Sequence, residues 1–139
     1  MSDLPLDAAG LQARLGHSPF IAFLGLTVLR ADPATETVVM RLPMRAGFER
    51  GAGTGQWHGG PIAAVIDTVG DYALIMLLGR PLPTVNFRVD YLRPAINTAL
   101  TATARVRRNG RSVGVVDVDI TNDAGALVAI GRATYATAG

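Results

Sequence analysis

The tripeptide His58-Gly59-Gly60 and the acid Asp67 are the residues of this chain best suited to chemistry on a carbonyl group. Gly59 opens a predicted helix, and the first N–H groups of a helix lack intrahelical partners and lie at its positive end. The amides of Gly59 and Gly60 can therefore donate to a polarised carbonyl oxygen, which the absence of a side chain lets approach closely. Asp67 lies two turns into an apolar helix, where a carboxylate needs a partner or holds its proton more tightly, and either condition suits a base or a nucleophile.

The spacing of these two groups places a limit on how they act. Gly59 and Asp67 are eight residues apart, which along one helix is about 12 Å, too far for both to act on one carbonyl carbon. A second copy of the chain must then supply one of them. Two such helices lying antiparallel across a two-fold axis would set the amide of one copy against the acid of the other, giving two equal composite sites per dimer.

The segment from Gly59 to Gly79 carries start and stop signals for one helix, with Pro61 in its first turn and a glycine at each end. It is apolar on nearly every face, so it either spans a membrane or is wrapped by the rest of its own protein. Asp67 and Asp71 would each add roughly 3 kcal/mol to insertion at mid-bilayer, and neither basic flanks nor a second span accompany them. We therefore expect a helix buried in a soluble protein, with no membrane partner.

Four segments after this helix alternate apolar and polar residues with the period of two that a strand shows when one face is wet. They are residues 84–91, 100–107, 112–122 and 127–137. Hairpin turn signals stand at Asn109-Gly110 and at Asp123-Ala124-Gly125. The short connections predict an antiparallel meander of these four strands.

Three further elements precede the helix. Leucines at helical spacing predict a short N-terminal helix over residues 4–16, and residues 23–42 predict a hairpin that turns at Asp32-Pro33-Ala34. Residues 44–57 hold four glycines and form a loop long enough to favour a functional role. The predicted fold class is α+β, with a curved antiparallel sheet of five or six strands wrapped around one long central helix.

Composition narrows the class of protein. A length of 139 residues predicts one domain, 1–139, with an N-terminal helix and lead-in over 1–20 and a main body over 21–137. Apolar residues make up 49% and charged residues 17%, which excludes disorder of the whole chain. The lack of cysteine excludes disulfides and thiolate chemistry, and two histidines alone predict no metal site. Because no secretory signal is readable, we expect a cytoplasmic protein.

The charge of the chain indicates little by itself. The net charge is +2, and all thirteen basic residues are arginine. No aromatic pairs interleave them, so nucleic-acid binding is not expected.

Two stretches, WHGGPIAAVID (57–67) and TVNFRVDYLRPA (84–95), carry a family resemblance. The HGG helix opening, the acid nine residues after His58 and the YLRPA strand end resemble the hotdog-fold acyl-CoA thioesterases of the 4-hydroxybenzoyl-CoA and phenylacetate-degradation type. The likeness covers about residues 20–137. It implies the hotdog fold, hydrolysis of an acyl-CoA thioester, no cofactor apart from the coenzyme A of the substrate, and a homodimer or dimer of dimers.

The resemblance also assigns roles to single residues. Gly59, with Gly60, holds the carbonyl oxygen, while Asp67 of the partner copy either attacks the carbonyl or activates water. Thr84 matches a position whose hydroxyl helps to place the water or the acid. His58 orients the loop or contacts the thioester region.

Candidate substrate contacts lie before, within and after the predicted helix in the sequence. The turn formed by Arg108, Asn109, Arg111 and Ser112 is the candidate for the phosphates of coenzyme A. Gln56 and Trp57 are candidates beside the thioester. The acyl group has five candidate apolar contacts, which are equally typical of core: Phe48, Trp57, Tyr72, Met76 and Leu77.

Two residues depart from the family pattern. Many relatives carry asparagine six residues before the histidine, where this chain has Ala52. Its polar role is unfilled unless a neighbour in the loop replaces it, and the candidates are Gln56, Glu49 and Arg50. Asp71, one turn after Asp67, is a candidate secondary acid that either shares a proton with Asp67 or fills a polar gap at the dimer seam.

Two other functions on the same fold stay open beside the thioesterase. A hotdog hydratase is one, although its usual arrangement of histidine and acid differs from the spacing seen here. A non-catalytic acyl-CoA binding or sensing protein is the other, and Ala52 favours it.

Overall fold

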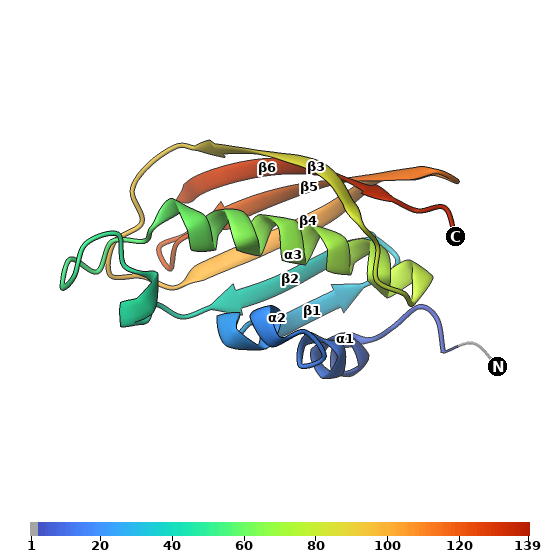
Figure 1. Ribbon diagram of the computed structural model, residues 1–139, viewed down its shortest axis with the longest axis horizontal. Coiled ribbons are helices and arrows are strands. Elements are labelled where there is room, and N and C mark those ends of the chain that lie inside the picture. Colours follow the sequence, from blue (N-terminus) through green and yellow to red (C-terminus); the bar gives the residue numbers. More distant parts are fainter. Residues whose placement is uncertain (1–2) are drawn as a thin grey trace.

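The computed structural model describes residues 3–139 as a curved sheet wrapped around one long helix (Figure 1). The helices are α1 (Ala8–Leu15), α2 (Pro19–Leu24) and α3 (Gly59–Leu78), with a 3₁₀ turn, η1, at Ala46–Phe48. The strands are β1 (Thr27–Asp32), β2 (Thr37–Leu42), β3 (Thr84–Tyr91), β4 (Leu100–Asn109), β5 (Val113–Thr121) and β6 (Leu127–Ala136). Every pair of neighbouring strands is antiparallel. The predicted hotdog architecture is confirmed, with six strands.

The order of the strands differs from the prediction. The sheet runs β1-β2-β4-β5-β6-β3, so the meander has three strands and not four. β3 pairs with β6, while β4 pairs with β2. The chain crosses the sheet between β3 and β4, and β3 becomes an edge strand. Alternation marks a strand locally, but the choice of its neighbour depends on pairing far away in the chain.

α3 is long and apolar enough to cross a membrane, with a mean hydropathy of 1.6, yet it is the core helix of a soluble fold. Its apolar side chains pack on the inner face of the sheet, where Ile66 and Leu74 are fully buried. The approach is close: a Cβ added to Gly131 of β6 would lie 2.5 Å from Ile66. The burial expected from its sequence is therefore supplied by its own sheet.

The N-terminal region differs in detail from the prediction. The first helix covers Ala8–Leu15, shorter than residues 4–16. Residues 19–24, of which the last two were predicted to begin a strand, form α2, which Ser18 caps and Gly25 ends with φ of 79°. Pro19 at the first helical position and Gly25 after the last are the signals that identify this helix.

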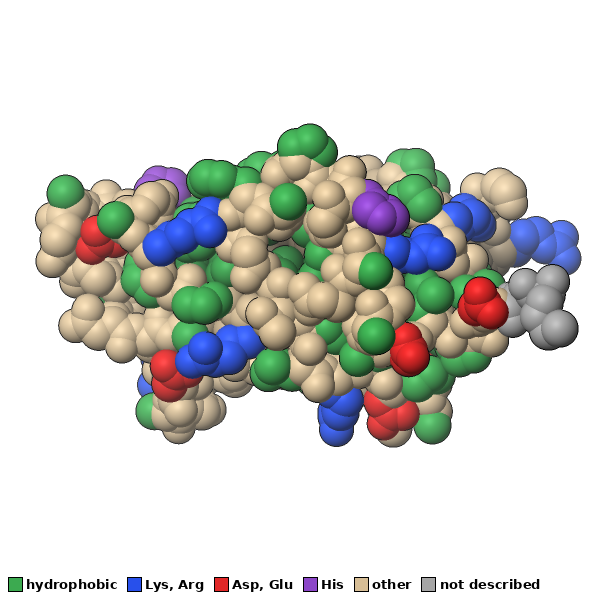
Figure 2. All heavy atoms as spheres, turned by 90° about the horizontal axis from the view of Figure 1, so that it is seen from below, with side chains coloured by type: hydrophobic (Ala, Val, Ile, Leu, Met, Phe, Trp, Pro, Cys, Tyr) green, Lys and Arg blue, Asp and Glu red, His purple; other side chains and the backbone are tan. Residues whose placement is uncertain are grey.

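An aromatic cluster joins α2 to the loop before α3. The Arg45 guanidinium lies 4.6 Å from the Phe23 ring centroid and 4.2 Å from that of Phe48. Phe48 in turn stacks on Trp57 at 5.5 Å. This aromatic cluster holds the segment just before His58 against the body of the protein. The surface that includes α1 and α2 shows hydrophobic side chains scattered among charged ones (Figure 2).

Candidate active site

The first turn of α3 is capped by a side chain from just outside the helix. His58 is the N-cap residue, and its Nδ1 accepts a hydrogen bond from the Gly60 N–H at 2.8 Å. The Gly60 amide that was predicted to bind substrate is therefore already engaged. Within residues 3–139 the Gly59 N–H has no hydrogen-bond acceptor. One donor at the positive end of α3 is left for a ligand.

A cleft of about 650 Å³ opens at this end of α3. Its walls come from the loop before α3, from the first turn of α3 and from the segment after β3. The polar and charged residues are Arg50, Gln56, His58 and Arg93, and the others are Trp57, Gly59, Gly60, Ile62, Tyr91, Leu92, Pro94 and Ala95. The predicted tripeptide, Gln56 and Trp57 therefore share one cleft, with an arginine on each of two walls.

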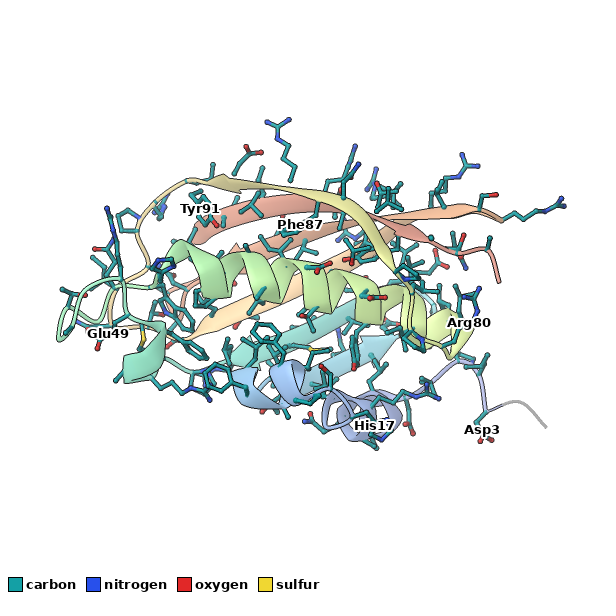
Figure 3. All side chains as sticks on the ribbon, viewed as in Figure 1. Asp3, His17, Glu49, Arg80, Phe87 and Tyr91 are labelled. Atoms are coloured by element: carbon teal, nitrogen blue, oxygen red, sulfur yellow. The ribbon has the colours of Figure 1, made fainter. Side chains whose placement is uncertain are left out.

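Tyr91, a residue without a predicted role in the site, closes over Gly59. Its hydroxyl donates to the Gly59 carbonyl at 2.7 Å, and Figure 3 shows it beside the first turn of α3. A Cβ added to Gly59 would lie 3.1 Å from the Tyr91 hydroxyl. The missing side chain at position 59 thus makes room for a tyrosine ring. YLRPA was recognised as a motif, but only the fold reveals which atom the tyrosine meets.

Asp67 is held by the first residue of β3. The Thr84 hydroxyl donates to Asp67 Oδ1 at 2.8 Å, and the Tyr135 hydroxyl donates to the Asp67 backbone carbonyl at 2.6 Å. The Asp67 side chain is half-buried, while Thr84 is exposed. Burial raises the pKa of Tyr135, with the charges of Asp67 and Asp71 adding to the effect, so this hydroxyl stays a donor. The structure therefore brings the Thr84 hydroxyl and the Asp67 carboxylate into contact.

Asp71 lies in a different environment from Asp67. It lines a second cavity, of about 280 Å³, between the α1–α2 segment and α3. Its Oδ1 is buried and has no hydrogen-bond partner among the described residues. Burial raises the pKa of Asp71 to about 7, the charge of Asp67 adds to the rise, and the backbone N–H of Leu82 opposes it. At neutral pH Asp71 is therefore protonated in a large fraction of the molecules.

The predicted phosphate-binding turn lies away from this cleft. Arg108, Asn109, Arg111 and Ser112 belong to the β4–β5 hairpin, at the end of the molecule where α3 finishes (Figure 1). A Cβ on Gly114, beside this hairpin, would meet Leu74, which lies in the last turns of α3. Within one chain these residues are not brought together with Gly59.

Most of the predicted acyl pocket is protein core. Phe48 and Met76 are buried, at 2% and 0% exposed. Trp57 is 3% exposed, and its indole N–H donates to the Thr98 carbonyl. Leu77 is only partly buried and packs against the core cluster. Tyr72 is the member of this set that lines the cavity beside Asp71.

The loop around Ala52 is organised by Glu49. The Glu49 carboxylate accepts the N–H groups of Gly53 at 3.3 Å and Gly55 at 2.6 Å. Both of its carboxylate oxygens are therefore used inside the loop, whereas Arg50 and Gln56 line the cleft.

Among residues 3–139 no group of three or more histidine and acidic side chains is placed to hold a metal ion.

Comparison with known proteins places this chain in a family. Residues 54–129 match the model of the thioesterase superfamily. The chain is 31% identical to the medium/long-chain acyl-CoA thioesterase YigI of Salmonella typhimurium, covering 86% of this chain and 85% of that protein. Human acyl-coenzyme A thioesterase 13 is 35% identical over 58% of this chain and 59% of its own length.

Solved structures agree with the sequence relatives. Zebra fish thioesterase superfamily member 2 superposes with a TM-score of 0.83 at 30% identity, covering 95% of this chain and 99% of that one. The PaaI protein from the phenylacetic acid degradation operon of Escherichia coli gives a TM-score of 0.80 at 28% identity, covering 91% and 89%. The HGG turn, the acid of α3 and the whole of β3 lie inside the matched family region. This chain belongs to the thioesterase superfamily and is a thioester hydrolase.

Proposed function

We propose that the protein is an acyl-CoA thioesterase whose two active sites each combine Gly59 of one copy with Asp67 of another. The observation that carries the proposal is the free Gly59 N–H, which lies at the positive end of α3 in a cleft lined by two arginines. An amide so placed stabilises the negative charge that develops on a thioester oxygen when its carbonyl is attacked. YigI and acyl-coenzyme A thioesterase 13 are named for this reaction.

Two copies are needed because both groups belong to one straight segment of α3. Their separation of eight residues is about 12 Å along the helix axis. The edge strand β3 supports pairing between copies, since its outer backbone groups are free to extend the sheet. Its side chains Val85 and Phe87 are 58% and 40% exposed, which a second copy lying on this edge would cover.

The reaction adds water across the thioester. Oxygen bonds to the carbonyl carbon, the carbon–sulfur bond breaks, and the coenzyme A thiolate takes up a proton. Asp67 either removes a proton from the attacking water or attacks first and is released by water. The Thr84 hydroxyl occupies Asp67 Oδ1, which leaves the other carboxylate oxygen for this work.

Arg50 and Arg93 are the cations of the cleft that holds Gly59. We infer that they bind phosphates of coenzyme A, because guanidinium groups pair with phosphate in bidentate fashion. Within one chain, Arg108 and Arg111 lie at the opposite end of α3 from this cleft. They reach the cleft only if a partner copy supplies them. Coenzyme A enters as part of the substrate, and the proposal includes no further cofactor. We place the reaction in the cytoplasm.

The proposal is tested with a panel of acyl-CoA thioesters from short to long chain, together with an aryl thioester, by detection of free thiol. The expected result is turnover of at least one member, lost in Asp67→Asn. Medium-chain and long-chain substrates come first because of the name of YigI. Turnover that survives Asp67→Asn unchanged contradicts the mechanism. Tight binding of acyl-CoA without turnover would instead indicate a sensor.

The same assay locates the phosphate contacts. Arg50→Ala and Arg93→Ala are each expected to raise KM roughly 3- to 10-fold with little change in kcat, because each removes a charged hydrogen bond made equally in ground and transition states. Arg111→Ala is the matched variant at the far hairpin. A rise in KM for Arg111→Ala alone would move the phosphates to that hairpin.

A further inference from the structure

The peptide unit between Gly59 and Gly60 is held at both of its polar ends. Its carbonyl accepts the Tyr91 hydroxyl at 2.7 Å, and its N–H donates to His58 Nδ1 at 2.8 Å. The neighbouring N–H, that of Gly59, has no acceptor within the described part of the chain. Gly59 is the first residue of α3, so its helical φ and ψ set the direction of the preceding peptide, which carries the Gly59 N–H, relative to this one.

The two glycines provide the space that this clamp needs. A Cβ on Gly59 would lie 3.1 Å from the Tyr91 hydroxyl and 3.2 Å from Tyr91 Cζ. A Cβ on Gly60 would lie 3.1 Å from His58 Nδ1. All three distances are shorter than ordinary contacts of a carbon atom. Each glycine therefore lets one holding side chain approach the first turn of α3.

The strand β3 supports both halves of the site. Its first residue, Thr84, donates to Asp67, and its last residue, Tyr91, donates to Gly59. The chain has three tyrosines, and each donates its hydroxyl to a backbone carbonyl; in two of them that carbonyl belongs to Gly59 or Asp67. Tyr72, the third, donates to the backbone carbonyl of Arg14, which lies in α1.

We propose that Tyr91 is a positioning residue of the thioesterase site, which holds the Gly59–Gly60 peptide so that the free Gly59 N–H points at the thioester oxygen. The proposal rests on the function proposed above. Tyr91 does not exchange protons with the substrate. It acts through Gly59, and its value lies in the transition state, where the oxygen becomes negative and the direction of the donor matters most.

Kinetics of Tyr91→Phe test the proposal. Removing one hydrogen bond is expected to lower kcat about 5- to 10-fold while KM stays within about twofold, because the loss is felt mainly in the transition state. Thr37→Val, at the start of β2, is the control, since it also removes a hydroxyl that donates to a backbone carbonyl and lies outside the cleft. It is expected to leave kcat unchanged. Equal kcat in wild type and Tyr91→Phe overturns the proposal.

Amide hydrogen exchange provides a readout that does not need turnover. In Tyr91→Phe, the Gly60 N–H is expected to exchange at least about fivefold faster, since the clamp on its peptide is halved. Thr37→Val is expected to leave it unchanged. If the wild type hydrolyses no acyl-CoA, the proposed function fails, while exchange still decides whether Tyr91 holds the peptide. Unchanged exchange at Gly60 overturns the proposal in either case.

Discussion

The first turn of α3 and its middle carry the two halves of the site, and they are built differently. At the first turn, His58 and Tyr91 hold the Gly59–Gly60 peptide from both ends within one chain. In the middle, the Thr84 hydroxyl holds the Asp67 side chain, and Asp71 buries an oxygen that has no hydrogen-bond partner among the described residues.

This difference follows from what each half has to do. A donor that stabilises a developing charge works best when it is fixed before the reaction begins. An acid that moves a proton or forms a bond must keep a lone pair free. The amide half is thus held within one chain, whereas in the proposed site the acid acts together with the amide of another copy.

Asp67→Asn is the change expected to have the largest effect on the acid half. It keeps the shape and the hydrogen bond from Thr84 but removes the base, so kcat should fall about 10³-fold or more. Substrate affinity should change little, because the amide half still binds the carbonyl. Single-turnover and steady-state thiol release measure this effect. If kcat falls by less than about tenfold, another group acts as the base or nucleophile.

Gly59→Pro tests the amide half by deleting a single N–H. Proline suits this first helical position, and His58 has the extended ψ of 147° that a residue before proline requires. Loss of the oxyanion donor should lower kcat about 100-fold.

Gly59→Ala is the control for this change, because it adds the same Cβ against Tyr91 and keeps the N–H. The alanine variant should lose much less activity. If proline and alanine variants have the same kcat, the Gly59 N–H is not the donor.

Asp71 predicts a dependence of stability on pH. Its pKa is about 7 when folded, against 3.8 in the unfolded chain, so the folded state binds the extra proton between these values and stability falls as pH rises from about 4 to about 7. Asp71→Asn removes this loss and should stabilise the protein by roughly 2–4 kcal/mol at pH 8.

Thermal melting of Asp71→Asn and wild type across this pH range measures the effect. Asp117 gives the opposite case, because its pKa is lowered, mainly by its hydrogen bond with Arg132. Asp117→Asn should cost stability above pH 4 instead of adding it. If the melting temperatures of Asp71→Asn and wild type change with pH in parallel, Asp71 is ionised in the folded protein and the prediction is wrong.

Local pattern predicted the central elements, and long-range pairing decided the rest. The α3 helix could be predicted because glycines bound an unbroken apolar run, and the strands because their side chains alternate. The place of β3 beside β6 depends on pairing between residues more than 35 positions apart, such as Phe87 with Ala133. No local signal specifies that choice.

The candidate site divides in the same way. Gly59 and Asp67 were found because both lie on one predicted helix, where spacing gives distance. Tyr91 was missed because its contact with Gly59 spans 32 residues and depends on the path of β3. The sequence favours Arg108 and Arg111 as phosphate contacts, because a cluster of arginines in sequence does not reveal which end of the molecule it occupies.

Mixing two inactive variants tests the central claim most directly. Asp67→Asn and Gly59→Pro chains, separately tagged and co-refolded, form mixed dimers in which one site has both an intact Gly59 and an intact Asp67. At random pairing, activity should return to about a quarter of the wild-type value. If mixed dimers form and no activity returns, each chain needs its own Gly59 and its own Asp67, and the composite site is contradicted.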